Sequence, residues 1–170
     1  MGCSSEFLAT KKEFIENWGR ISGFWGICKS MAQVHALLII SSKPLSAPCI
    51  IEELEISSGG VNTHLRELVE WGLVYKCQNT SGRKDFYFAE KNMLTVFRQI
   101  ILNRKRRELD PIIDLIQKVD HQQANCAEST EFVKVITDIK AISSLIDNAL
   151  DSILNIDQEN MMETLIKMEH

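Results

Sequence analysis

The stretch SSGGVNTHLRELVEWGLV, residues 57–74, decides the fold of this chain. It opens with Ser57 and Ser58, a residue type that caps helix N-termini, and it contains Gly72, the residue type that most often ends a helix in a left-handed turn. Between these signals, the apolar residues recur at helical spacing: Val61, Leu65, Leu68 and Val69. The pattern predicts a helix that runs to about Trp71 and buries one apolar stripe.

The opposite face of this predicted helix is small and polar at its N-terminal end. Small residues let the backbone approach another surface closely, and in the major groove arginine can pair with guanine and asparagine with adenine. Six residues are therefore candidate DNA contacts: Ser58, Gly59, Gly60, Asn62, Thr63 and Arg66. The same residues are equally typical of a helix cap followed by a solvated face, and from this helix alone both interpretations stay open.

After Gly72 the hydrophobic pattern changes from a helical period to β-prone runs. Residues 73–77 and 85–88 are rich in branched and aromatic side chains, and residues 79–82 form a turn sequence between them. The predicted hairpin carries Arg83 and Lys84 just after its turn, where two cations could hold phosphate. The hairpin is therefore the second candidate DNA contact.

Upstream of residue 57, the sequence predicts two helices, one over about 31–41 and a short one over 47–54. The short helix has Ser46 as its cap and Pro48 in its first turn. An aromatic-rich stretch from Glu6 to about Lys29 also has helical spacing, with glycines that indicate a break. Helix, short helix, turn, helix and hairpin, in that order, are typical of a winged helix-turn-helix domain.

Downstream, a further helix is predicted from about Asn92, and Asp110-Pro111 either ends or kinks it. A loop over 125–129 precedes a long helix. Its apolar side chains approach a heptad pattern: Phe132, Ile136, Ile139, Ile142 or Ser143, Ile146, Leu150 and Ile153. The chain is thus predicted to be a mainly helical α+β protein. Its three parts are an N-terminal helix over 1–30, the winged helix-turn-helix domain over 31–91 and dimerisation helices over 92–170.

The net charge of −4 hides a division along the chain. Residues 1–109 hold 15 Lys and Arg against 11 Asp and Glu, whereas residues 110–170 hold 4 against 12. The first part could approach a polyanion and the second would avoid one. Within the first part, the run Arg104-Lys105-Arg106-Arg107 is usually a solvated helix face, although it could also reach phosphates.

The sequence resembles the GbsR/MarR-type transcriptional regulators over roughly residues 14–116. The resemblance rests on residues 57–68 with Trp-Gly-Leu-Val at 71–74, on Gly-Arg-Lys at 82–84 with Phe-Tyr-Phe at 86–88, and on residues 19–23. It implies a homodimeric DNA-binding repressor from a bacterium or archaeon, often tied to uptake or synthesis of osmoprotectants. Some members sense choline or related small molecules. Gly59-Gly60 departs from the family's usual Lys-Gly pair, and beyond about Asp120 only the helical character matches.

We therefore expect a homodimer that places two copies of the helix over 58–71 into successive major grooves of double-stranded DNA, on an inverted repeat. The alternative is a winged helix that binds another protein through the same polar face. Overall acidity, the Gly59-Gly60 pair and the modest positive charge of the first part support that alternative.

An effector site is a further interpretation of the aromatic residues near the N-terminus. Four of them could form a cage for a quaternary ammonium ligand: Phe14, Trp18, Phe24 and Trp25. An aromatic stripe at helical spacing is more often part of a core or a dimer contact, so both interpretations stay open.

The remaining signals argue against an enzyme or a metalloprotein. The five cysteines are scattered without a Cys-x-x-Cys pair, and the four histidines have no partners at ligand or catalytic spacing. We therefore expect no catalytic residues, metal or cofactor. No apolar run approaches a membrane span and no secretory signal is visible, so the predicted location is the cytoplasm, without a membrane partner.

Overall fold

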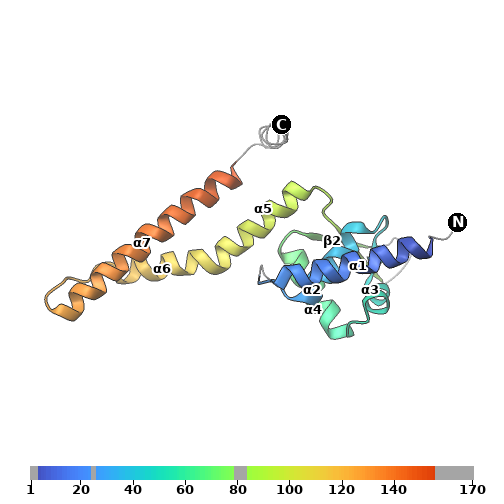
Figure 1. The fold of residues 1–170 in the computed structure, drawn as a ribbon, viewed down its shortest axis with the longest axis horizontal. Coiled ribbons are helices and arrows are strands. Elements are labelled where there is room, and N and C mark those ends of the chain that lie inside the picture. Colours follow the sequence, from blue (N-terminus) through green and yellow to red (C-terminus); the bar gives the residue numbers. More distant parts are fainter. Residues whose placement is uncertain (1–3, 24–25, 79–83, 156–170) are drawn as a thin grey trace. The chain divides into compact units, whose positions relative to one another are not determined.

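A computed structural model describes residues 4–23, 26–78 and 84–155 of the chain (Figure 1). The chain forms two compact units, Met1–Val96 and Phe97–His170. The described residues are mainly helical and include one small antiparallel sheet, as the predicted fold class requires.

The first unit contains four helices and three strands among its described residues, and the helix α5 (Met93–Arg104) leads out of it. The elements are α1 (Ser5–Ser22), α2 (Lys29–Ile40), β1 (Leu45–Ser46), α3 (Ala47–Leu54), α4 (Ser58–Glu70), β2 (Val74–Gln78) and β3 (Asp85–Ala89). Every predicted helix of this unit is present. The N-terminal helix stops at Ser22, next to one of the glycines that indicated a break.

The sheet has the strand order β1-β3-β2, and both pairings are antiparallel. Val74 of β2 pairs with Ala89 of β3, and both side chains are buried. The third strand, β1, was not predicted, because two residues after a proline carry no periodic pattern. Only pairing with a partner about 40 positions away, Leu45 with Tyr87, makes this segment a strand.

The core of the first unit is built around α2, which has more buried residues than any other described helix. Val34, Leu37 and Leu38 are fully buried, whereas Ile40 at the end of the helix is 39% exposed. Helix α1 packs on α2 through Gly19, where a Cβ atom would lie 2.6 Å from Cγ of Gln33. A glycine at this point therefore lets the two helices approach closely.

In the second unit the chain stays helical through Asp110-Pro111. Helix α5 passes directly into a π-helical segment, η2 (Lys105–Leu109), and then into α6 (Asp110–Val119). The backbone N–H of Asp110 donates to the carbonyl of Lys105, five residues back. The proline thus does not end the helix. A π turn, whose hydrogen bonds span five residues, precedes it, and the ribbon bends between α5 and α6 (Figure 1).

The long helix is α7 (Ala127–Leu154), which packs against α6 and η2. It begins within the predicted loop over 125–129, because Cys126 and Ser129 form a reciprocal cap. The sequence left Ile142 and Ser143 as alternatives for one position of the heptad pattern. In the structure, Ser143 is buried and Ile142 is exposed. No helix in the described part of the chain is both long and apolar enough to cross a membrane.

Candidate nucleic-acid interface

Helix α4 is anchored by three fully buried side chains, Val61, Leu65 and Leu68. Gly72 follows it at a φ of 71°, and the N–H groups of Gly72 and Leu73 donate back into the last turn. Both features agree with the sequence prediction. Val69, however, was wrongly placed in the buried stripe and is 40% exposed, since it lies at the edge of that stripe in the last turn.

The N-terminal end of α4 presents its polar residues to solvent. Ser58, Gly59, Asn62, Thr63 and Arg66 are all exposed, and Gly60 is half-buried. Ser57 caps the helix by accepting a 3.2 Å hydrogen bond from the N–H of Gly60. A helix N-terminus carries a partial positive charge and unpaired N–H groups, so this end suits an anionic partner.

The two glycines of this end differ in what surrounds them. A Cβ atom on Gly60 would lie 3.1 Å from Cγ2 of Ile56 and 3.2 Å from Oγ of Ser57, so it would crowd the cap. A Cβ atom on Gly59 would meet nothing within 4 Å. Gly59 is thus the open position of the pair.

His64 lies beside the buried stripe of α4, one position before Leu65. Its side chain is only 14% exposed, and its Nδ1 is 3.7 Å from Oε2 of Glu67. The structure therefore keeps His64 out of the exposed polar face.

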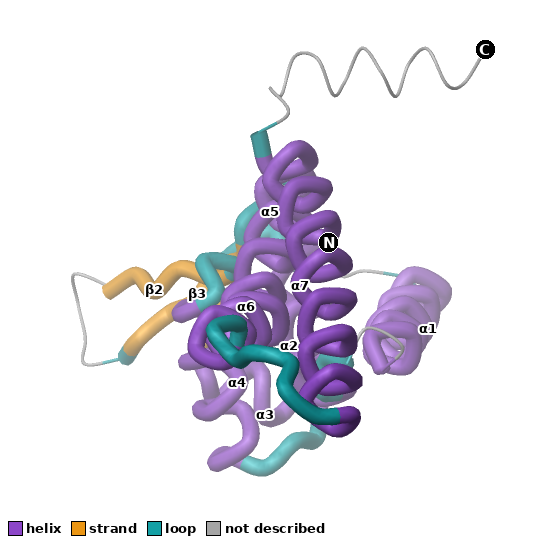
Figure 2. Tube along the Cα trace, turned by 90° about the vertical axis from the view of Figure 1, so that its left-hand side faces the viewer, coloured by secondary structure: helices purple, strands orange, loops and turns teal. Residues whose placement is uncertain are grey.

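The hairpin of β2 and β3 extends from the helices of the first unit (Figure 2). Lys84 is exposed at the start of β3, whereas Arg83 lies outside the described residues. Lys76 pairs with Asp85 across the hairpin at 2.8 Å, and this hydrogen bond raises the pKa of Lys76. Asp85 therefore offsets the charge of Lys76 and leaves Lys84 as the other described lysine of the hairpin.

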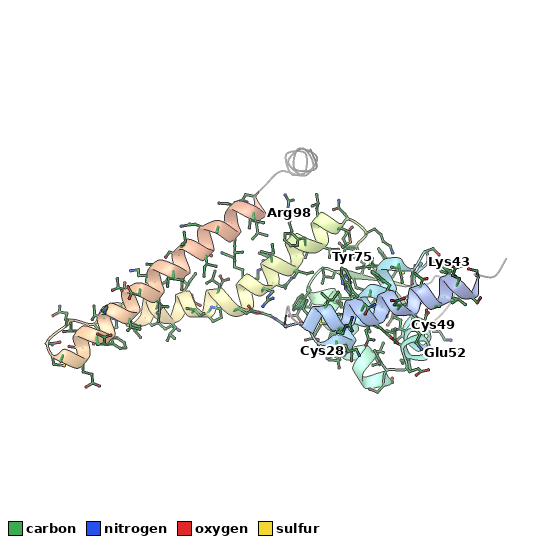
Figure 3. The ribbon with its side chains drawn as sticks, in the orientation of Figure 1. Cys28, Lys43, Cys49, Glu52, Tyr75 and Arg98 are labelled. Atoms are coloured by element: carbon green, nitrogen blue, oxygen red, sulfur yellow. The ribbon has the colours of Figure 1, made fainter. Side chains whose placement is uncertain are left out.

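Carboxylates are also present on and beside α4. Glu52 lies on α3, which packs against α4 (Figure 3), and Glu55 follows α3 with a left-handed φ of 54°. Glu70 is exposed at the far end of α4. Residues 47–70 hold one arginine against five glutamates, so these two helices do not share the positive sum over residues 1–109.

The proposed aromatic cage is represented by one pair in the described residues. The rings of Phe14 and Trp18 lie 5.6 Å apart on the solvent side of α1, tilted by 31°. Phe24 and Trp25, the other two members, lie outside the described residues. This pair forms one wall and encloses no ligand on its own.

Part of the basic run in the second unit is neutralised by ion pairs. Arg104 pairs with Glu108 at 3.0 Å, and Nζ of Lys105 lies 2.6 Å from Asp147 and 3.2 Å from Asp151. The hydrogen bond to Asp147 raises the pKa of Lys105. The aspartates are over 40 positions away in sequence, so the run alone did not reveal them.

Sequence reasoning missed Lys91, which ties the hairpin to α2. Its Nζ donates to the carbonyls of Leu38 and Ser41, each at 2.9 Å, and to that of Ile39. Burial lowers the pKa of this ammonium group. Lys91 also lines a cavity of about 320 Å³ at the base of the hairpin, together with Lys43 and Tyr75 (Figure 3). A lysine that follows a helix closely in sequence is known to bond the last carbonyls of that helix. Lys91 gives no such signal, because α2 ends about 50 residues upstream.

Comparison with known proteins identifies the architecture. No protein-family model and no curated protein matches the sequence. A crystal structure of a transcriptional regulator aligns with 85% of this chain and 95% of its own, with a TM-score of 0.64 and 16% sequence identity. The fold is a winged helix-turn-helix.

Two mutants of MepR from S. aureus also align with the winged-helix chain. They cover 98% and 99% of it, and 96% and 100% of their own chains, at 14% and 13% identity and TM-scores of 0.37. At 16% identity, the likeness to the first regulator extends to the fold alone, and any function must be argued from the residues of this chain.

Proposed function

We propose that this protein is a sequence-specific transcriptional regulator that binds double-stranded DNA as a homodimer, without chemistry at the site. One observation carries the proposal. The helix that follows the turn of a winged helix-turn-helix exposes donors and acceptors at its N-terminal end and buries its opposite face completely. In this fold that end of the helix is the part that reaches base edges.

In the proposed complex, Asn62, Thr63 and Arg66 read bases in the major groove. Ser58, Gly59 and Gly60 bring the start of α4 close to the DNA backbone, and Arg83 and Lys84 hold phosphates. A homodimer presents α4 twice, and its target is therefore an inverted repeat.

The resemblance to GbsR-type regulators extends the proposal to a repressor that occludes a promoter and controls uptake or synthesis of osmoprotectants. A small-molecule effector would act by changing the separation of the two reading helices. The exposed pair of Phe14 and Trp18 is the described part of the effector site that we propose.

The proposal is tested by selecting bound sequences from a random duplex pool. We expect an inverted repeat whose half-site centres are about 10 base pairs apart, one turn of DNA. Failure to enrich any sequence at low salt, with a folded dimer confirmed, would overturn the proposal.

Replacing Arg66 with alanine is expected to weaken binding to the selected site by about 1–3 kcal/mol and to relax the preference at one base position. The reason is that a side chain reading a base edge contributes to discrimination, whereas one on phosphate does not. Titration of labelled specific and random duplexes measures both affinities. Arg20→Ala, which removes the same charge from the exposed surface of α1, is the matched control. Equal losses on both duplexes would contradict base reading by Arg66.

Replacing Gly59 with lysine is expected to strengthen binding to all duplexes and to steepen the dependence of log K on log salt by about 0.9. The position is open, so the side chain can extend without a clash and add one phosphate contact. Gly23→Lys is the control, because a Cβ atom there also meets nothing within 4 Å. A slope that is the same for both variants would place Gly59 away from the DNA backbone.

The second candidate function is a protein-interaction module that uses the same face of α4. The exposed carboxylates of Glu52, Glu55 and Glu70, on or next to α3 and α4, favour it, since they repel a polyanion. Retention on immobilised nonspecific DNA separates the two candidates. Steep loss of binding as salt rises indicates the DNA regulator, and no retention at low salt indicates the protein partner.

A further inference from the structure

The cavity at the base of the hairpin is lined only by residues of the first unit. One wall is the segment 41–44, which connects α2 to β1. The other wall is formed by Tyr75 of β2 and by residues 88–91, where β3 ends. We call this space of about 320 Å³ the hairpin-base cavity. Its volume is within the range of cavities that hold small molecules.

Backbone and side-chain hydrogen bonds fix both walls of the hairpin-base cavity. Nζ of Lys91 donates to the carbonyls of Leu38 and Ser41, which joins the segment after β3 to the end of α2. Leu45 of β1 pairs with Tyr87 of β3 directly after the segment that forms the first wall. A cavity whose walls are already fixed binds a ligand without the cost of ordering them.

Two aromatic rings give the cavity an apolar surface that the described chain leaves uncovered. Tyr75 and Phe88 pair across the hairpin, with their ring centroids 5.3 Å apart, and they are 40% and 39% exposed. Pro44, which is also exposed, contributes apolar surface from the other wall. An apolar group that enters the cavity therefore removes this surface from water, which favours binding.

The cavity also contains a carboxylate that is held in place. Oε1 of Glu90 accepts a hydrogen bond of 2.8 Å from the backbone N–H of Asn92, and Oε2 accepts one of 3.0 Å from the hydroxyl of Tyr75. The bond from Asn92 and then the bond from Tyr75 lower the pKa of Glu90, which is therefore ionised at neutral pH. Since a carboxylate has about four acceptor positions, Glu90 can still accept from a ligand.

Of the two lysines that line the cavity, Lys43 is the one available to a ligand. Lys91 directs its ammonium group to three carbonyls, those of Leu38, Ile39 and Ser41, and an ammonium group has three N–H donors. Lys43 is exposed, and within the described part of the chain its ammonium group has no hydrogen bond or ion pair. The cavity thus combines an available cation, a fixed anion and two rings.

We propose that the hairpin-base cavity binds a free α-amino acid with an apolar side chain. Such a zwitterion brings an ammonium group to Glu90, a carboxylate to Lys43 and an apolar side chain to the rings of Tyr75 and Phe88. The ammonium group gains further from the ring faces, because aromatic rings attract cations. A ligand with a single charge leaves either Glu90 or Lys43 without a partner. The site goes beyond the proposed DNA binding and does not depend on it.

Three ligands that differ by one charge each test the proposal on the full chain. L-Phenylalanine carries both charges, phenethylamine lacks the carboxylate and 3-phenylpropionate lacks the ammonium group. In ligand-observed NMR titrations, L-phenylalanine should bind, and each analogue should bind roughly tenfold more weakly, because one charge-assisted hydrogen bond is lost. No binding of L-phenylalanine at about 10 mM overturns the proposal, and so does an analogue that binds equally well.

Two substitutions assign the binding to this cavity. Lys43→Gln should weaken the binding of L-phenylalanine roughly tenfold and leave that of phenethylamine unchanged. Glu90→Gln should weaken the binding of L-phenylalanine and leave that of 3-phenylpropionate unchanged. Lys12→Gln and Glu13→Gln remove the same charges from the exposed surface of α1 and should have no effect. Binding of L-phenylalanine that both cavity variants retain places the ligand elsewhere and overturns the proposal.

The test does not depend on the stability of one variant or on DNA. Glu90→Gln changes a bonded group, so circular dichroism must show that it is folded, whereas Lys43 is exposed and Lys43→Gln removes no bond of the described chain. If Glu90→Gln unfolds, Lys43→Gln alone decides. Absence of ligand binding leaves the DNA-binding proposal standing. Failure of the sequence selection likewise leaves the ligand titrations valid.

Discussion

Replacing Leu65 with alanine is expected to lower the free energy of unfolding of the first unit by about 2–5 kcal/mol, since a buried leucine loses its transfer free energy and leaves a cavity. Leu65 is 1% exposed and lies in the middle of the stripe that fixes α4 to the core. Urea unfolding followed by tryptophan fluorescence measures the change. All three tryptophans belong to the first unit, so the signal reports on that unit alone.

The control is Thr63→Ala on the exposed face of the same helix, for which we expect a change within about 0.5 kcal/mol in stability. DNA binding should show the reverse order at temperatures where both variants are folded. Thr63→Ala should lose affinity, and Leu65→Ala should keep most of it. If both substitutions changed stability equally, the assignment of one face to the core and the other to a partner would be wrong.

Acidification is expected to destabilise the first unit through His35. This side chain is 5% exposed in the middle of α2, and burial lowers its pKa from 6.5 to about 4. The unfolded chain therefore takes up a proton at higher pH than the folded chain does. The stability is fully present above about pH 6.5, falls as the pH drops from there to 4, and ends lower by about 3 kcal/mol.

Urea unfolding at a series of pH values, with and without His35→Leu, measures this loss. Among the described residues, Nε2 of His35 has no hydrogen-bond partner, so leucine removes a buried polar atom without breaking a bond. The variant should keep its stability down to pH 4.5, apart from the titration of carboxylates. His121→Leu, at an exposed position, should behave like the wild type. A wild-type slope retained by His35→Leu would assign the acid sensitivity to other groups.

The elements that the sequence predicted correctly are those whose signals are local. Helix α4 has its cap, its stripe and its terminal glycine within 16 residues, and the structure uses all three. The short helix α3 has Ser46 and Pro48 at its start and begins at the expected residue. The second hairpin strand likewise follows its own β-prone run.

The features that were missed depend on partners that are distant in sequence. Strand β1 exists only by pairing with β3, and Lys105 is neutralised by aspartates on another helix. The apolar residues of the heptad pattern on α7 differ in exposure: Phe132, Ile139 and Ile146 are exposed, whereas Ile136 and Leu150 are half-buried. Which of them face inward is decided by packing against α6 and η2, and periodicity contains no information on that.

The candidate site was predicted from residue types, and the structure adds its surroundings. Five of the six α4 candidates lie among its first six residues, and Arg66 lies in its second half; all except Gly60 are exposed. How the carboxylates of α3 lie relative to α4 could not be predicted from sequence, because the angle between two helices is set by tertiary packing. The choice between DNA and a protein partner therefore depends on experiments on Arg66 and Gly59.

The π-helical segment before Pro111 shows where this chain can change its length. A π turn holds about one residue more than an α turn, so an added residue is taken up locally and the helix beyond it keeps its angular phase. Removing one exposed residue there, such as Arg106, would restore an ordinary α turn and leave the faces of α6 where they are. The same deletion in α7 would turn every residue beyond it by about 100° around the helix axis. We accordingly expect related chains to vary in length at this turn. It lies next to Pro111, whose backbone nitrogen has no hydrogen to donate to the helix.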